Sequence, residues 1–238
     1  MAEKWNTLGA PTPRVDGLER VTGRATYSAD IRLPDMLYAR VLRSPHPHAR
    51  IRSIDGSRAL ALDGVRAVLT HENCQIVWSS GDRVNQRRIF NNPVRLVGDP
   101  VAAVAATDRH LAEEALKLVE VEYEILDFVL TAEEALELGA VEIHPGGNLS
   151  PVISFTSQGP GKREPSTYIR GDGDKGFAVS DRVFEDHFIS KHINNAQMEP
   201  RVAVARWEGD KLTVWTPTQG ISNCHRDIAR SLGMPLEK

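Results

Sequence analysis

The chain has 238 residues, of which 41% are hydrophobic and 26% charged, and its formal net charge is −3. This composition is typical of an ordinary globular protein, and the length allows one large domain or two small ones. The charge gives no basic field for nucleic acid, and no apolar run approaches the roughly 20 residues of a membrane span, so we expect neither partner.

The first part of the chain contains an arm and two candidate strands. Residues 1–14 are polar and interrupted by glycine and proline, which predicts an extended arm. Residues 36–43 and 64–70 are rich in strand-forming side chains and flanked by turn residues, so both are predicted strands. Between them, Ser44–His48 is expected to be extended or turned, because residues before proline avoid the helical region.

A strand, a helix and a second strand are predicted in the middle of the chain. Pro100–Ala106 is a continuous apolar run that suits a strand buried on both faces. Thr107 is the expected N-cap of a helix whose apolar positions recur up to Val119. Val119–Ile125 then alternates apolar residues with glutamates, as a half-buried strand does. We expect both strands in one sheet with the helix packed on its face, hence an α+β fold.

The remaining elements are a capped helix, a linker, a long strand, a hairpin and a last helix. Thr131 and Glu134 form a capping box for a helix that ends at Gly139, and residues 145–176 are rich in Gly, Pro and Ser, like a linker. A long strand is predicted over 182–193 and a hairpin over 202–216. The last predicted helix runs from Ser222, as N-cap, to Leu232, with Gly233 as the stop signal.

Metal sites have little support from spacing. His46 and His48 could supply two zinc ligands, but no other Cys or His stands at a recognised spacing, so hydrogen-bonded loop histidines are favoured. Asp172–Gly176 resembles a calcium loop, yet the sixth position, where glycine is required, is Phe177. A polar turn is therefore the preferred interpretation of that segment.

The cysteines and glutamates also favour ordinary structural roles. Cys74 and Cys224 form no Cys-x-x-Cys pair, and two reduced thiols are favoured over a single disulfide. Two thiolates cannot hold an iron–sulfur cluster, so an electron-transfer centre would belong to another chain. The glutamates at 120, 122 and 124 share one strand face, which favours a solvated face over a catalytic cluster. Because the N-terminus lacks a secretory signal, we expect a cytoplasmic location.

Nine short segments occur in the order that they have in one protein family. They are Arg14–Gly17, Thr22–Asp30, Arg43–Asp55, Gly64–Val68, Gly98–Ala102, Glu114–Tyr123, Gly173–Ala178, Gln197–Pro200 and Trp215–Gly220. In this order they resemble the first part of the molybdenum-binding subunit of the xanthine dehydrogenase and aldehyde oxidase hydroxylases. The resemblance implies an extended arm over 1–14, an α/β hammerhead domain over 15–130, a capped helix and linker over 131–165, and the opening part of a molybdopterin-binding domain over 166–238.

The resemblance also implies a cofactor site. Gln219 matches the family's glutamine that hydrogen-bonds an oxygen ligand of molybdenum, and Gly220 accompanies it at the cofactor. A neutral amide can donate two hydrogen bonds without adding charge. The plainer interpretation of Gln219 is a loop residue whose amide caps the following helix. Glu199 matches an acidic residue of the family and is interpreted as structural.

The implied activity belongs to a complex. The family hydroxylates a heterocycle or an aldehyde with oxygen from water, using molybdenum–molybdopterin (the cytosine dinucleotide form) and iron–sulfur and FAD centres on partner chains or domains. The family's glycine-rich segment, its later pterin loops and its general-base glutamate are not found in this sequence, so no catalytic or metal-ligating residue is assigned and the chain alone is expected to be inactive. The expected partners are the remainder of the molybdenum subunit, the iron–sulfur and FAD subunits and a small-molecule substrate. Truncation and a naturally split subunit both remain open, and the alternative function is a non-catalytic assembly subunit.

Overall fold

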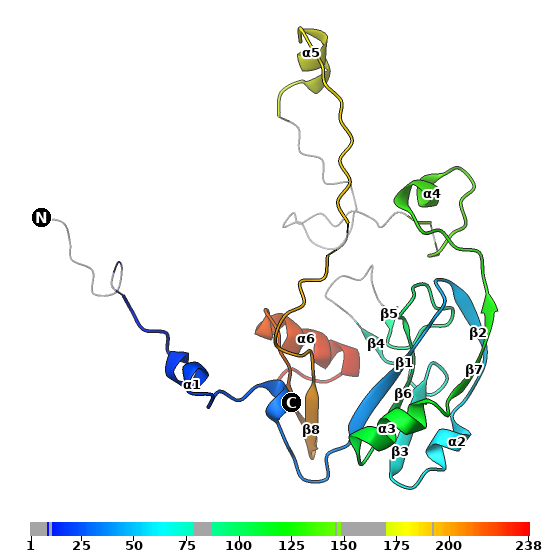
Figure 1. The fold of residues 1–238 in the computed structure, drawn as a ribbon, viewed down its shortest axis with the longest axis vertical. Coiled ribbons are helices and arrows are strands. Elements are labelled where there is room, and N and C mark those ends of the chain that lie inside the picture. The colour runs from blue at the N-terminus through cyan, green and yellow to red at the C-terminus, as the bar shows by residue number, and fades with distance from the viewer. Residues whose placement is uncertain (1–8, 10, 79–86, 146, 149–169, 192) are drawn as a thin grey trace, which may run out of the picture. The chain divides into compact units, whose positions relative to one another are not determined.

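The computed structural model describes residues 9, 11–78, 87–145, 147–148, 170–191 and 193–238 (Figure 1). Most of the predicted arm and residues 149–169 of the predicted linker lie outside the described residues. The chain forms two compact units, one made of Met1–Met36 together with Asn195–Lys238 and the other of Leu37–Asn194.

The unit Leu37–Asn194 is built on a three-stranded antiparallel sheet. Its order is β1 (Tyr38–Arg43), β6 (Pro100–Ala106) and β3 (Val65–Thr70), which confirms the three predicted strands to within two residues. The central strand β6 carries the core, because Val101 and Val104 are fully buried. An apolar run without alternation suits a strand that is covered on both faces.

Helix α3 (Arg109–Leu116) packs on this sheet through its small residues. Ala112 and Ala115 are fully buried and belong to the same apolar cluster as Val104. Asp108 is the N-cap, not the predicted Thr107, and its carboxylate accepts hydrogen bonds from the backbone N–H groups of His110 and Leu111. The reason is that the N–H of Thr107 still bonds the carbonyl of Gly64 at 2.9 Å, so strand pairing extends to Thr107 and the helix begins after it.

Strand β7 (Glu120–Ile125) forms as predicted, but the prediction that it shares a sheet with β6 is wrong. It pairs antiparallel with β2 (Ala49–Asp55), a strand that was not predicted from the sequence, in a separate two-stranded sheet. Both edges of β6 are taken by β1 and β3, so β7 has no edge of β6 to join. The crossover rule applies only to strands of one sheet.

The acidic residues of β7 contact the strand beside them. Glu124 forms ion pairs with Arg50 at 3.0 Å and Arg52 at 2.8 Å, and the Ser53 hydroxyl donates to Glu122 at 3.1 Å. Exposed pairs of this kind stabilise a fold only slightly. Their partners across the strand give these glutamates a structural role.

Four of the smaller elements of this unit are short. They are α2 (Ser57–Leu60), β4 (Val77–Trp78), β5 (Arg87–Arg88) and α4 (Ala132–Leu136). The capping box predicted for α4 is confirmed, because the Thr131 hydroxyl accepts from the N–H of Glu134 while the Glu134 carboxylate accepts from the N–H of Thr131.

Two predictions near the end of this unit are wrong. The polar turn expected at Asp172–Gly176 is a short helix, α5 (Gly173–Ala178), because the Asp172 carboxylate caps it by accepting from the N–H of Lys175. The strand expected over 182–193 is absent, since the described residues there have no regular structure. Phe184 and Phe188 are 83% and 88% exposed, and a strand forms only where a neighbouring backbone pairs with it.

The second unit contains the predicted hairpin and last helix. Its elements are α1 (Gly17–Val21), the 3₁₀ turn η1 (Ser28–Asp30), β8 (Val204–Glu208), β9 (Lys211–Trp215) and α6 (Ile221–Leu232). Glu208 pairs with Lys211, so Gly209 (φ 63°) and Asp210 form a two-residue loop. No described helix is long and apolar enough to cross a lipid bilayer.

Candidate cofactor site

The loop between β9 and α6 holds both residues that the sequence assigned to a cofactor. Within it, the backbone N–H of Gly220 donates to the hydroxyl of Thr218 at 3.1 Å. This local hydrogen bond fixes the backbone on either side of Gln219 and turns the chain into the helix. The Gln219 side chain itself is exposed.

The start of α6 lacks a side-chain cap. Its N-cap is Gly220, not the predicted Ser222, because the hydrogen-bond ladder already begins with the N–H of Cys224 donating to the carbonyl of Gly220 at 2.9 Å. No side chain caps this end, and no acidic residue lies in the first turn. The first N–H groups of a helix have no partner within the helix, so this end presents donors and a partial positive charge.

Gln219 does not serve the helix that follows it. Among the described residues, none forms a hydrogen bond with its side-chain amide, so the interpretation of Gln219 as a helix cap has no support. The amide can therefore donate to a group from outside this chain. Gly220 leaves space beside it, since a Cβ added there would come no closer than 3.7 Å to the Asn223 side chain.

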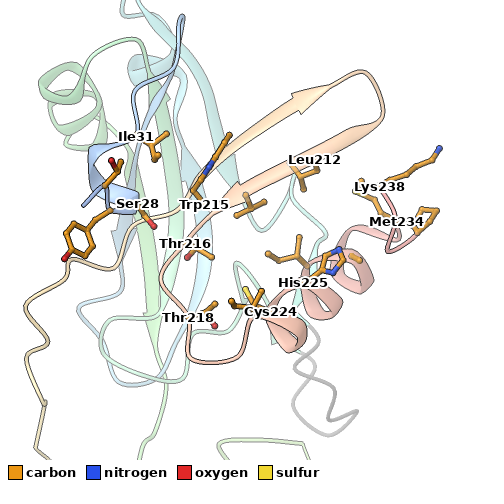
Figure 2. Close-up of a pocket in the computed structure, with 17 residues that line it drawn as sticks. Ser28, Ile31, Leu212, Trp215, Thr216, Thr218, Cys224, His225, Met234 and Lys238 are labelled. Carbon is orange, nitrogen blue, oxygen red and sulfur yellow. The ribbon is translucent and has the colours of Figure 1, made fainter. Parts of the chain in front are cut away.

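An apolar cavity of about 490 Å³ lies next to this loop, entirely within the unit of Met1–Met36 and Asn195–Lys238. Its lining includes Leu212 and Val214 of β9 and Ile228 and Ala229 of α6. Figure 2 shows Leu212, Trp215, Cys224 and His225 around the space. Thr218 lines the cavity and Gln219 does not.

The segment before residue 36 also lines this cavity, a contact that was not predicted from the sequence. Tyr27 and Ile31 come from the segment around η1, which is far from α6 in sequence. No local pattern announces such a contact. The α6 contribution had a signal, because Cys224 and Ile228, four positions apart, share one helix face.

Asp16 forms ion pairs with Arg14 and Arg20 in the same unit as Glu199. Arg14 and Arg20 lower the pKa of Asp16 to about 2 through hydrogen bonds to its carboxylate. The hydrogen bond to Asp16 is the largest cause of the raised pKa of Arg20, and the charge of Glu199 makes the smallest contribution to it. The interpretation of Glu199 as structural stays a prediction.

The donor set of the loop fits an anionic cofactor rich in oxygen atoms. The uncapped start of α6 favours a negatively charged group. The unbonded Gln219 amide can donate hydrogen bonds to oxygen acceptors. The neighbouring cavity is apolar and suits hydrocarbon side chains instead. We therefore place the candidate cofactor contact at Gln219, Gly220 and the first turn of α6.

The other candidates of the sequence have structural partners. The Nδ1 of His48 lies 2.6 Å from the carbonyl of Asp127, and the His46 ring packs edge-on against Tyr123. Cys74 and Cys224 are both free thiols. Across the described ranges, no three His, Cys, Asp or Glu side chains gather as metal ligands would.

Two family models match the sequence of this chain. Residues 22–127 match the aldehyde oxidase and xanthine dehydrogenase a/b hammerhead domain, and residues 157–238 match the molybdopterin cofactor-binding domain. The hairpin, the loop with Gln219 and α6 all fall within the second match.

Curated relatives and solved structures agree with these models. The chain is 35% identical to the nicotinate dehydrogenase large molybdopterin subunit of Eubacterium barkeri over 240 residues, which cover 100% of this chain and 53% of that subunit. It is 30% identical to the carbon monoxide dehydrogenase large chain of Afipia carboxidovorans, over 100% of this chain and 30% of the relative. The structure resembles quinoline 2-oxidoreductase from Pseudomonas putida 86 with a TM-score of 0.77 and 32% identity, over 95% of this chain and 29% of that one.

The chain thus spans about half the length of the first of these relatives and less than a third of the second. The matches nevertheless cover nearly all of this chain, in both of its units. This chain belongs to the molybdenum-binding subunits of the xanthine dehydrogenase and aldehyde oxidase family, with a hammerhead domain followed by molybdopterin-binding sequence.

Proposed function

We propose that the chain forms part of the cofactor-binding surface of a molybdenum hydroxylase that oxidises a heterocycle or an aldehyde with oxygen derived from water. The observation that carries this proposal is the Gln219 amide, which is exposed and unbonded among the described residues, beside the uncapped start of α6. The molybdopterin cofactor, once bound, supplies the redox chemistry. The proposal assigns the cytosine dinucleotide form to it.

The residues of this chain would bind and orient that cofactor. The Gln219 amide donates hydrogen bonds to cofactor oxygen atoms, and it adds no charge that would shift the electron density of the metal. Gly220 lets the backbone approach closely, and the N–H groups of the first α6 turn favour an anionic group. No residue of this chain is assigned a proton transfer.

The remaining parts of the enzyme would come from elsewhere. The proposed partners are the rest of the molybdopterin subunit, an iron–sulfur subunit and an FAD subunit, in the cytoplasm. An iron–sulfur cluster usually takes four cysteine thiolates as ligands, and this chain has only two cysteines. The names of several relatives, such as the subunit gamma of the 6-hydroxypseudooxynicotine dehydrogenase complex, describe multi-subunit enzymes.

A chimera tests the proposal directly. This chain would replace the aligned region of the nicotinate dehydrogenase large molybdopterin subunit, to which it is 35% identical. We expect the chimeric complex to contain molybdenum and pterin near the level of the parent complex, measured by metal analysis and pterin fluorescence. A complex that assembles fully but contains neither would contradict the proposal and favour an assembly subunit.

A further inference from the structure

The loop that carries Gln219 is stiff at both of its ends. Residues 216–220 connect β9 to α6. Pro217 has a fixed φ angle, and a proline also restricts the residue before it, which here is Thr216. At the other end, the N–H of Cys224 donates to the carbonyl of Gly220 at 2.9 Å and ties that residue to the helix. The remaining conformational freedom of the loop is therefore concentrated directly around Gln219.

Thr218 restrains this remaining freedom. Its hydroxyl accepts a hydrogen bond from the N–H of Gly220 at 3.1 Å, so the bond spans Gln219 without involving the Gln219 side chain. A side-chain hydroxyl that bonds the backbone two residues ahead forms a closed turn and fixes the chain between them. Thr218 suits this task because a β-branched side chain has few rotamers and loses little freedom when it bonds.

The positions on either side of Gln219 need such a restraint. Gly220 is the N-cap of α6, and glycine has more accessible backbone conformations than any other residue. No side chain caps this helix, and both Thr218 and Gln219 are exposed, so tight packing does not hold them. The direction in which the Gln219 side chain leaves the loop therefore depends on the bond between Thr218 and Gly220.

We propose that Thr218 is the positioning residue of Gln219, and that its hydroxyl, by holding the Gly220 N–H, aims the Gln219 amide at a cofactor oxygen atom. The inference rests on the proposed function, because it requires that Gln219 contacts the cofactor. Thr218 itself touches neither cofactor nor substrate in this proposal. Its effect is transmitted through geometry, since a hydrogen bond weakens steeply when its donor is displaced or tilted.

Amide hydrogen exchange tests the restraint on the full chain without cofactor. Thr218→Val keeps the β-branched shape but removes the acceptor, whereas Thr218→Ser keeps the acceptor. We expect the Gly220 amide to exchange at least about threefold faster in Thr218→Val and at nearly the wild-type rate in Thr218→Ser, because an N–H without a partner exchanges more readily. The Met234 amide, which bonds the Ala229 carbonyl at the far end of α6, reports whether the helix stays folded. Equal Gly220 exchange in wild type and Thr218→Val would overturn the proposal.

Turnover per molybdenum in the cofactor-loaded chimera tests the function of the restraint. Thr218→Val should lower it by roughly three- to tenfold, while the molybdenum content stays near that of the parent complex. Thr218→Ser should restore most of the turnover, because the hydroxyl is the group that matters. Thr216→Val makes the same chemical change two residues earlier and is the matched control, for which we expect little change. A Thr218→Ser variant as slow as Thr218→Val, or an equal loss in Thr216→Val, would overturn the proposal.

A double variant shows whether Thr218 acts through Gln219. In the Gln219→Ala background no amide is left to aim, so adding Thr218→Val should lower turnover by less than about a further twofold. Effects that multiply would mean that Thr218 acts on the cofactor or the fold by itself, which would overturn the proposal.

The same measurements distinguish a failure of this inference from a failure of the proposed function. If Gln219→Ala lowers turnover per molybdenum and Thr218→Val leaves it unchanged, the cofactor contact of Gln219 stands and only the positioning role of Thr218 is refuted. If Gln219→Ala keeps full turnover per molybdenum, both are refuted.

Discussion

The side chain of Asn92 pairs with the backbone of Ile51 as a strand would. Its Oδ1 accepts from the Ile51 N–H and its Nδ2 donates to the Ile51 carbonyl, both at 2.9 Å. The backbone of Val94 adds two hydrogen bonds to Ala49, at 2.9 and 3.1 Å. Together these contacts cover the first part of the β2 edge that β7 does not occupy, at Ala49 and Ile51, and a covered edge resists pairing with other chains.

Asn92→Ala should lower the free energy of unfolding by about 1–3 kcal/mol, because it removes the two hydrogen bonds to the buried backbone of Ile51 and the contact of the Asn92 Nδ2 with the His71 Nε2 at 3.2 Å. Ile51 is only 4% exposed, so water replaces them poorly. Urea unfolding of the full chain measures the loss. Asn91→Ala is the matched control, since Asn91 donates only one hydrogen bond, to the Arg88 carbonyl. Equal losses in both variants would show that the pairing with Ile51 contributes nothing special.

Gly64→Ala should destabilise the hammerhead sheet for two separable reasons. Gly64 has a φ of 92°, and an added Cβ would lie 2.6 Å from the Leu111 Cδ2 and 2.8 Å from the Thr107 Oγ1. Gly98 has a φ of 95° with nothing within 4 Å, so Gly98→Ala isolates the backbone term. We expect about 1–2 kcal/mol for Gly98→Ala and about 1–3 kcal/mol more for Gly64→Ala. Urea midpoints that coincide would mean that Leu111 and Thr107 move aside without cost.

Local signals explain which elements the sequence predicted. The hairpin β8–β9 has its turn glycine at 209, and α6 ends at Gly233, whose φ of 65° is the left-handed conformation expected of a helix stop. Each signal lies within a few residues of the element that it defines. Elements of this kind are therefore predicted by sequence patterns.

Partner choice explains the predictions that were wrong. The alternation in β7 shows that this segment can form a strand. It does not show that the partner is β2, whose Ile51 pairs with Tyr123 although it lies about 70 residues earlier in the chain. The apolar segment around Phe184 and Phe188 is equally suited to a strand, yet no described backbone lies beside it. The site has the same difficulty, since the role of Gln219 depends on a group that the sequence does not contain.

The N-cap of α3 should make part of the stability sensitive to acid. Hydrogen bonds from the backbone N–H groups of Leu111 and then His110 hold the pKa of Asp108 below its ordinary value. A carboxylate with a lowered folded-state pKa stabilises the fold above its unfolded pKa of about 3.9 and loses that effect as pH falls through the folded value. Asp108→Asn keeps a capping side chain that does not titrate.

The melting temperatures of wild type and Asp108→Asn should therefore converge or cross as pH falls from 5 toward 2.5. Circular dichroism melts at closely spaced pH values give both curves. The other acidic groups titrate equally in the two proteins, so the difference reports Asp108 alone. A difference that stays constant over this range would show that the cap does not depend on ionisation.

Substitutions at Gln219 should separate its donor function from its size. In the cofactor-loaded chimera, Gln219→Ala should lower turnover by roughly ten- to a hundredfold, the effect of losing one strong hydrogen bond of about 1.5–3 kcal/mol in the transition state. Gln219→Glu has nearly the same shape but replaces two donors by a negative charge, so it should lower turnover at least as much and also weaken cofactor retention.

Molybdenum per complex and turnover are measured for each variant, and turnover is divided by molybdenum content. Because the side chain is exposed and has no hydrogen bond to the described chain, the melting temperature should stay unchanged in both variants. Full turnover per molybdenum in Gln219→Ala would refute the assignment, and a lowered melting temperature would show that Gln219 serves the fold instead.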